Sequence, residues 1–207
     1  MQVSTYSWPT PLPATIRARR RGRCAARALG FTLIELMITL AVAVILLVIA
    51  VPSFRTMTIS NRLTTTANDV VSALNTARME AIKRNTSTQL CSNNATLNTS
   101  DTLGTACGTA TGAVKTLIGS PAVASTVGAG TIGIVTPLQL SGDMAAVRFG
   151  GQGLGYVPGT ATVFSNTVVN ICSNAISSNN HRVIKLTAGS IIETLPSTSS
   201  SSTGPCP

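Results

Sequence analysis

The chain has 207 residues and a net charge of +9, but only 10% of its residues are charged and 3% are aromatic. A chain of this length suits one domain of ordinary size with an attached anchor. One histidine and six scattered acidic residues supply neither a carboxylate pair for hydrolysis nor a set of metal ligands, so the composition argues against an enzyme and against a metal site.

The positive charge is concentrated at the N-terminus. Six of the 15 basic residues are arginines between Arg17 and Arg27, ahead of every acidic residue. Basic residues beside an apolar segment remain in the cytoplasm, so this cluster is a topology signal. The high net charge is therefore weak support for a nucleic-acid partner.

An apolar run follows the basic cluster, from Phe31 to Val51, with the sequence FTLIELMITLAVAVILLVIAV. As a helix it would rise about 31 Å, which matches a bilayer hydrocarbon core of about 30 Å. We expect it to cross the membrane once, with everything after Val51 on the extracytoplasmic side. Glu35 is the one charge inside the run, and a carboxylate in a membrane helix needs a partner.

Two ordinary interpretations of this run remain open. A secretory signal peptide could be cut at Val48-Ile49-Ala50, although its apolar region would normally have about 7–15 residues. A plain single-span anchor has the right length but gives no reason for Glu35.

The segment Gly30-Phe31-Thr32-Leu33-Ile34-Glu35, followed by Pro52, resembles the cleavage and methylation signal of type IV prepilins and type II secretion pseudopilins. The resemblance implies that prepilin peptidase cuts after Gly30 and that Phe31 becomes the N-methylated first residue. It also implies that Glu35 pairs with the terminal amine of a neighbouring subunit during assembly, and that Pro52 can kink the helix.

Beyond Pro52, apolar residues recur at spacings of three and four from Phe54 to Ile82, so we expect one helix over about 32–84 with an ion pair between Glu80 and Arg84. The chain is then expected to have four parts. They are a basic leader that is cleaved (1–30), a membrane or filament-core half of the helix (31–52), an amphipathic half (53–85), and a β-rich head with a Ser/Thr-rich tail at 197–203 (86–207).

Short β-type runs separated by Gly, Asn, Ser and Thr make up the head. The predicted strands are 86–91, 113–118, 131–136, 144–149, 161–165, 168–172, 182–187 and 190–194. Thr187-Ala188-Gly189-Ser190 is expected to form a hairpin turn, and the glycine-rich 150–155 a flexible turn. The predicted fold class is α+β, with a long N-terminal helix packed on a small antiparallel β-sheet head, as in pilins.

Four cysteines would remain after cleavage at Gly30, namely Cys91, Cys107, Cys172 and Cys206; Cys24 would leave with the leader. They lie on the side expected to be oxidising, so they predict two disulfides, for which three connectivities are possible. We prefer Cys91–Cys107, which closes a local loop, and Cys172–Cys206, which ties down the tail. No cofactor is expected.

The head resembles the GspH/FimT branch of minor pilins and pseudopilins. The residues that carry this resemblance are the helix end ARMEAIKRN (77–85), which leads to Cys91, and Val147-Arg148-Phe149 with its following glycines. It implies a subunit of the bacterial inner membrane with its head in the periplasm, later at the tip of a pilus or pseudopilus. The implied partners are prepilin peptidase, other pilins or pseudopilins, the inner-membrane assembly platform and membrane lipid.

Some members of this branch bind DNA through arginines after the last glycine. Here Gly189 is followed by Ser-Ile-Ile-Glu, and the nearby cations are only Arg182 and Lys185. Binding to phosphate strengthens with the number of cationic contacts, and two are few. A DNA-binding minor pilin for natural transformation is therefore only the alternative function. His181, next to Arg182, is expected to be a solvated loop residue.

Overall fold

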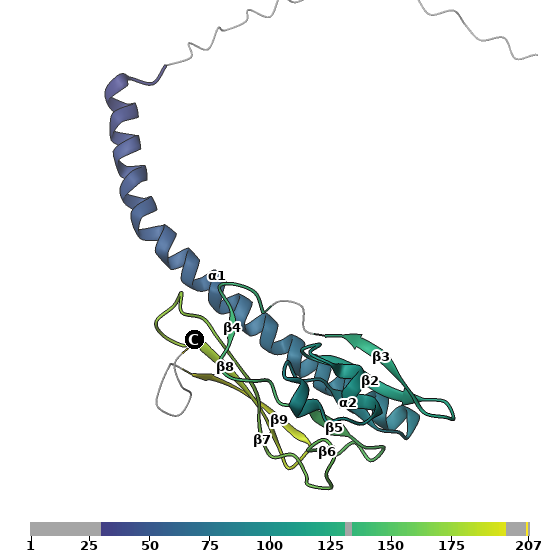
Figure 1. The fold of residues 1–207 in the computed structure, drawn as a ribbon. Coiled ribbons are helices and arrows are strands. Elements are labelled where there is room, and N and C mark those ends of the chain that lie inside the picture. Colours follow the sequence, from purple (N-terminus) through teal and green to yellow (C-terminus); the bar gives the residue numbers. More distant parts are fainter. Residues whose placement is uncertain (1–29, 131–133, 198–205, 207) are drawn as a thin grey trace, which may run out of the picture. The chain divides into compact units, whose positions relative to one another are not determined.

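A computed structural model describes residues 30–130, 134–197 and 206 (Figure 1). The tail 198–203, the leader before Gly30 and Cys24 lie outside the described residues. The elements in chain order are α1 (Leu33–Arg84), β1 (Thr88–Leu90), the 3-10 helix η1 (Ala95–Asn98), α2 (Thr102–Cys107), β2 (Ala113–Ile118), β3 (Val123–Ala129), β4 (Gln139–Leu140), β5 (Val147–Phe149), β6 (Gly155–Tyr156), β7 (Asn166–Cys172), β8 (His181–Thr187) and β9 (Ile191–Ser197).

The internal contacts divide the chain into two units, Met1–Val44 and Ile45–Pro207. The described part of the first unit is the start of α1, in which every residue from Gly30 to Val44 is exposed. Thr32 caps this helix, because its hydroxyl oxygen accepts a hydrogen bond from the Glu35 amide at 3.2 Å. A Thr with a Glu three residues later is the sequence pattern of a capping box.

The second unit contains the rest of α1, which buries one face against the head. The buried helix residues are Leu63, Thr66, Ala67, Val70, Leu74, Ala77 and Ala81. They recur at spacings of three and four, as on one face of a helix. The buried face begins later than the sequence pattern indicates, since Phe54 and Met57 are exposed. The pair Glu80–Arg84 forms as expected, with Arg84 Nε 2.6 Å from a Glu80 carboxylate oxygen.

The head has two antiparallel sheets where we expected one. Within the described residues, the first sheet has the strand order β3-β2-β1-β5-β6 and the second has β4-β7-β8-β9. Both sheets contribute to one core with α1, and Figure 1 shows the second half of α1 lying against them. Phe149 of the first sheet and Ile184 of the second are fully buried in this core. The confirmed fold is therefore a pilin-like α+β fold with an aliphatic core.

Some elements differ from the sequence prediction. The strand β3 was not expected, because its sequence VASTVGA lacks an alternation of apolar and polar residues. Its backbone pairing with β2 stabilises the strand, although its own residues favour a strand only weakly. No strand forms at 134–136, and 131–133 lie outside the described residues. The predicted strand 161–165 is reduced to an isolated bridge between Tyr156 and Val163.

Backbone hydrogen bonds connect the two sheets at the turn between β8 and β9. They link Gly189 of this turn, Gly155 of β6 and Phe164. Ala188 and Gly189 have φ values of 49° and 65°, and the Ser190 amide donates to the Thr187 carbonyl, so the predicted hairpin turn forms. The Gly189 carbonyl accepts from the Gly155 amide of β6 at 2.8 Å, and the Phe164 amide donates to the Gly155 carbonyl. A Cβ atom on Gly189 would lie 2.6 Å from the Gly155 oxygen, so this contact requires glycine.

The structure contains the disulfides Cys91–Cys107 and Cys172–Cys206, which is the connectivity that we preferred. The first disulfide encloses a buried polar cluster centred on Asn98. The side-chain oxygen of Asn98 accepts from the Ser92 amide at 2.8 Å, and its nitrogen donates to the Gly108 carbonyl at 2.9 Å. The loop 91–107 therefore has internal order as well as a covalent closure.

Arg148 of β5 connects this loop to the first sheet. Its guanidinium donates to Gln89 of β1 and to both carboxylate oxygens of Asp101, the N-cap of α2. The hydrogen bond from Arg148, assisted by one from the Gly104 amide, lowers the pKa of Asp101 from 3.8 to about 2. The ionised form of Asp101 therefore stabilises the folded head above pH 4.

Replacing Asp101 with asparagine should test this contribution. Because the Asp101 side chain is 44% exposed, the ion pair is screened, and we expect Asp101→Asn to lower the free energy of unfolding by about 1 kcal/mol at pH 7. The folded-state pKa is depressed, so the stabilisation is lost as the pH falls from about 4 to about 2. Urea denaturation at pH 7 and pH 2.5 measures it; an equal effect of the substitution at both pH values would contradict the assignment.

Candidate functional site

The segment in which cleavage is expected, Gly30–Phe31, lies before the helix and is exposed. Gly30, Phe31 and Thr32 precede α1, and the Phe31 side chain is 78% exposed. A Cβ atom on Gly30 would meet no atom within 4 Å, so the fold itself does not require glycine there. Within the described residues, the backbone at Gly30 is therefore open to contact by another molecule.

Glu35 lies in the first turn of α1, four residues after Phe31, and is exposed. Within the described residues it forms no ion pair; the three ion pairs there involve Glu80, twice, and Asp101. Its backbone amide donates to the Thr32 hydroxyl, and its side chain is exposed to solvent. The structure thus places Gly30, Phe31 and Glu35 on one short stretch.

The apolar residues after Glu35 form a helix that could cross a membrane. Its most apolar 18-residue window has a mean hydropathy of 3.0, and none of that window is buried. A helix of this length near the N-terminus would also fit a signal sequence. The residues around its start must therefore decide between a signal sequence and a prepilin helix.

Comparison with protein-family models supplies that decision. Residues 26–51 match the prokaryotic N-terminal methylation motif, and residues 66–189 match the type II transport protein GspH. The second match covers more than half of the chain. The chain belongs to the GspH family. Searches of curated proteins and of solved structures gave no match.

Membership of the GspH family settles the general role of the chain. It is a type II secretion pseudopilin, a structural subunit with no enzymatic activity, and its N-terminus carries the methylation motif of processed prepilins. Prepilin peptidase and other pseudopilins are the partners that the family implies. The exposed apolar helix is consistent with an inner-membrane prepilin.

The GspH match begins on the buried face of α1 and ends at the turn after β8, so it covers the last part of α1, the whole first sheet and the second sheet except β9. Arg78 of α1 holds these parts together. Its Nη2 donates to the Ser190 carbonyl at 2.6 Å, and its guanidinium lies 5.4 Å from the centroid of the Phe149 ring. Both Arg78 and Phe149 lie in segments that carry the family resemblance, but no sequence pattern indicated their contact.

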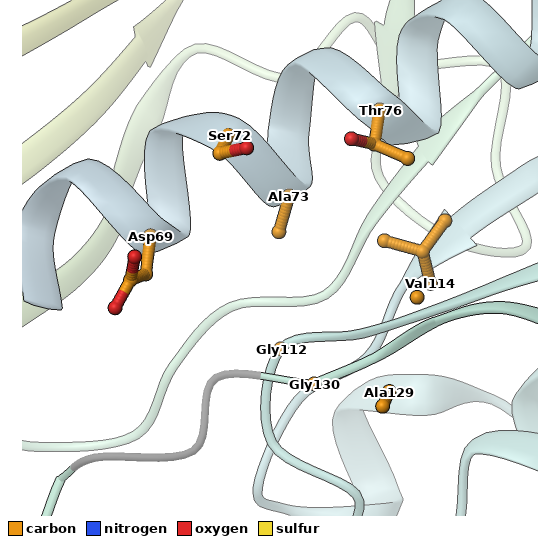
Figure 2. A pocket seen from close by; sticks show the side chains of 9 residues that line it. Asp69, Ser72, Ala73, Thr76, Gly112, Val114, Ala129 and Gly130 are labelled. Carbon is orange, nitrogen blue, oxygen red and sulfur yellow. The ribbon is translucent and has the colours of Figure 1, made fainter. Parts of the chain in front are cut away.

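A hollow of about 310 Å³ lies between α1 and the β2–β3 pair (Figure 2). Its helix side carries Asp69, Ser72 and Thr76, and its sheet side carries mainly small residues such as Gly112 and Gly130. Figure 2 shows Asp69 at one end of the hollow, away from Thr76. Among the described residues, the hollow therefore has one carboxylate beside hydroxyl groups and glycines.

The two residues of the DNA hypothesis have different surroundings. The Arg182 guanidinium is buried and donates to the Asn179 and His181 carbonyls and to Ser60 of α1, so a phosphate contact would have to break these bonds. Lys185 is half-buried on the second sheet. The geometry gives the DNA hypothesis no support beyond Lys185, and binding to duplex DNA stays a prediction.

The expectation for His181 is wrong. His181 is the first residue of β8 and is fully buried, with its Nδ1 2.9 Å from the side-chain oxygen of Asn170 on β7. It lies opposite Cys172 in the sheet, beside the disulfide to Cys206. The sequence marks a loop up to Asn180, but the strand begins one residue earlier than expected. Burial lowers the pKa of His181 below 6.5.

The buried imidazole should make the head less stable in mild acid. The unfolded chain binds a proton at His181 near pH 6.5, whereas the folded chain binds it only at lower pH, so stability falls as the pH decreases through that window. We expect a loss of up to about 1.4 kcal/mol per pH unit below 6.5. Urea midpoints at pH 7.5 and pH 5 measure it, and His181→Asn should remove most of the difference. Equal midpoints for the unsubstituted chain would contradict the assignment.

Proposed function

We propose that the chain is cut after Gly30, methylated at Phe31, held in the inner membrane by α1 with its head in the periplasm, and then built into the pseudopilus through Glu35. The observation that carries this proposal is the coincidence of an accessible Gly30–Phe31 bond with a Glu35 carboxylate that has no ion-pair partner in the described chain. The methylation motif at 26–51 supports it.

The chemistry of the cut explains why a glutamate is useful there. Cleavage creates a positively charged amine on Phe31, and N-methylation keeps that charge. A carboxylate surrounded by hydrocarbon is costly until it pairs, so Glu35 favours a position in which the amine of a neighbouring subunit lies against it. The pair would then fix the register between two helices whose other contacts are apolar and uniform.

Pro52 gives the same helix a point at which it can bend. The structure has Pro52 inside α1, where a proline cannot donate to the carbonyl four residues earlier. The exposed helix before it and the head-bound helix after it can therefore change their angle at a small cost. We propose that Pro52 lets the apolar half settle into the filament core while the head keeps its own contacts.

Within the filament, we propose a place at the tip, where the subunit helps to prime assembly. The resemblance of residues 77–91 to the GspH/FimT branch supports this place. The test is a strain that lacks the gene and is complemented with the tagged chain. Immunogold labelling of sheared pseudopili should give particles at one end only, and deletion should reduce both the number of filaments and secretion. Labelling along the whole filament would contradict the tip role.

A further inference from the structure

The first cation after the apolar run is Arg55. Nineteen uncharged residues separate Glu35 from Arg55 in the sequence, and a helix of that length rises about 28 Å, close to the hydrocarbon thickness of a bilayer. Arg55 comes four residues, or about 6 Å, after Val51. That distance corresponds to the headgroup layer on the far side, where the lipid phosphates lie.

Arg55 is available for a ligand in the described structure. It is exposed, and no hydrogen bond or ion pair to it is present among residues 30–130, 134–197 and 206. Arg62 follows seven residues later on the same flank of α1 and is also exposed. Arg55 and Arg62 therefore form a short positive strip on the part of α1 that follows the apolar run.

The first contacts between α1 and the head lie four to five residues after Arg55. Ile59 packs against the core, and Arg182 donates to Ser60 and Thr64, so the second sheet contacts the helix from that level on. Residues 52–58 are all exposed and lie between the apolar run and the head. This interval of about two turns is the place where the polar surface of a membrane would meet the protein.

Beside Arg55 is a shallow, open hollow on the surface of α1 that is lined by Ala50, Val51, Phe54 and Arg55. Three of these residues are apolar and the fourth is the cation, so the hollow combines an apolar wall with one positive charge. Phe54 is 71% exposed, and aromatic residues are enriched at the level of membrane headgroups. A phospholipid has the matching arrangement, with an acyl chain below a phosphate.

We propose that Arg55 binds the phosphate of an anionic phospholipid in the periplasmic leaflet, with its acyl chain against Val51 and Phe54 and with Arg62 adding attraction for a neighbouring headgroup. The inference rests on the proposed orientation, with the head outside. Opposite charge selects this occupant over a neutral lipid. The site holds the subunit at a defined height, and the contact must break when the helix leaves the membrane for the filament.

A tryptophan at position 54 tests the site. Trp8 is the only tryptophan in the sequence, so Trp8→Phe with Phe54→Trp leaves one reporter whether or not the leader is cut. The full chain is reconstituted in vesicles of phosphatidylcholine, with or without phosphatidylglycerol at one part in four. Lipids brominated at several depths then locate the tryptophan by quenching. Arg55→Gln is compared with Arg84→Gln, another exposed arginine of the same helix that pairs with Glu80.

We expect phosphatidylglycerol to fix the reporter near the headgroups, and Arg55→Gln to remove at least half of that effect, while Arg84→Gln leaves it intact. If the tryptophan of Arg55→Gln is still quenched, and its depth responds to phosphatidylglycerol as in the unsubstituted chain, the lipid site alone would be overturned. An equal effect of inorganic phosphate on phosphatidylcholine vesicles would also overturn it, since the ligand would then not be a lipid. No quenching by any brominated lipid would overturn the placement of α1 in the membrane, and with it the proposed function.

Discussion

Replacing Glu35 with alanine is expected to abolish assembly and secretion while the chain still folds and loses its leader. The carboxylate makes no ion pair within the described chain, and its side chain is exposed at the start of α1, so its loss should leave the head unchanged. If Glu35 pairs as proposed, the same loss leaves the amine of a neighbouring subunit in an apolar setting without its counter-charge. Removing one partner of such a buried pair costs about 3–5 kcal/mol, or a factor of about 10² to 10⁴ in association.

The measurement is secretion of a reporter protein from a strain that carries only the substituted gene, with pseudopili counted by electron microscopy. Glu193→Ala is the matched control, because Glu193 is an exposed acidic residue of β9, far from α1 in sequence, and its loss should leave secretion at the level of the unsubstituted chain. Normal secretion by Glu35→Ala would show that the carboxylate has no partner in assembly.

Removal of the disulfide between Cys172 and Cys206 is expected to have the largest effect on stability. Its loop spans 34 residues, for which the loop-entropy model gives about 4 kcal/mol, whereas the 16-residue span of Cys91–Cys107 gives about 3 kcal/mol. A domain of this size has a total stability of about 5–15 kcal/mol. Loss of either bond should therefore take away a large fraction of it.

Urea denaturation of the mature chain in detergent micelles measures both effects. The two pairs are replaced with alanine in separate variants, and reduced unsubstituted protein gives the combined loss. We expect the Cys172/Cys206 variant to unfold at a lower urea concentration than the Cys91/Cys107 variant, because the polar cluster around Asn98 still orders the shorter loop. A loss below about 1 kcal/mol for either pair would show that the other contacts of the head already fix that segment.

The long helix was predictable because its signal is long. Apolar residues at helical spacing continue for some 20 residues up to Ala81, and no other element could bury them in that order. The strand β2 was predicted with its observed bounds, since Ala113–Ile118 combines alternation with β-branched residues. The strand β3 and the six-residue α2 were not, because a short element takes its stability from its neighbours: β3 from β2, and α2 from its Asp101 cap and the disulfide at Cys107.

The burial of the polar residues Arg182 and His181 could not be predicted from the sequence, for a different reason. Arg182 and His181 appear in the sequence as exposed cation and loop histidine, but their partners come from distant segments, Ser60 of α1 and Asn170 of β7. Such pairing is fixed only when two sheets and a helix meet. Gly30, Phe31 and Glu35 show the opposite case. Their pattern was recognisable in the sequence because it is a local motif within residues 26–51 and does not depend on how the head folds.

Mass spectrometry of the mature N-terminus, on protein purified from the membrane fraction of cells with prepilin peptidase, tests the central claim most directly. We expect the N-terminal peptide to begin with N-methylated Phe31 and no peptide to contain residues before it. Protein that begins at Val51 would be a secreted protein released from a signal peptide, and protein that retains the leader would be a plain anchor. Either result would contradict the assembly mechanism proposed for Glu35.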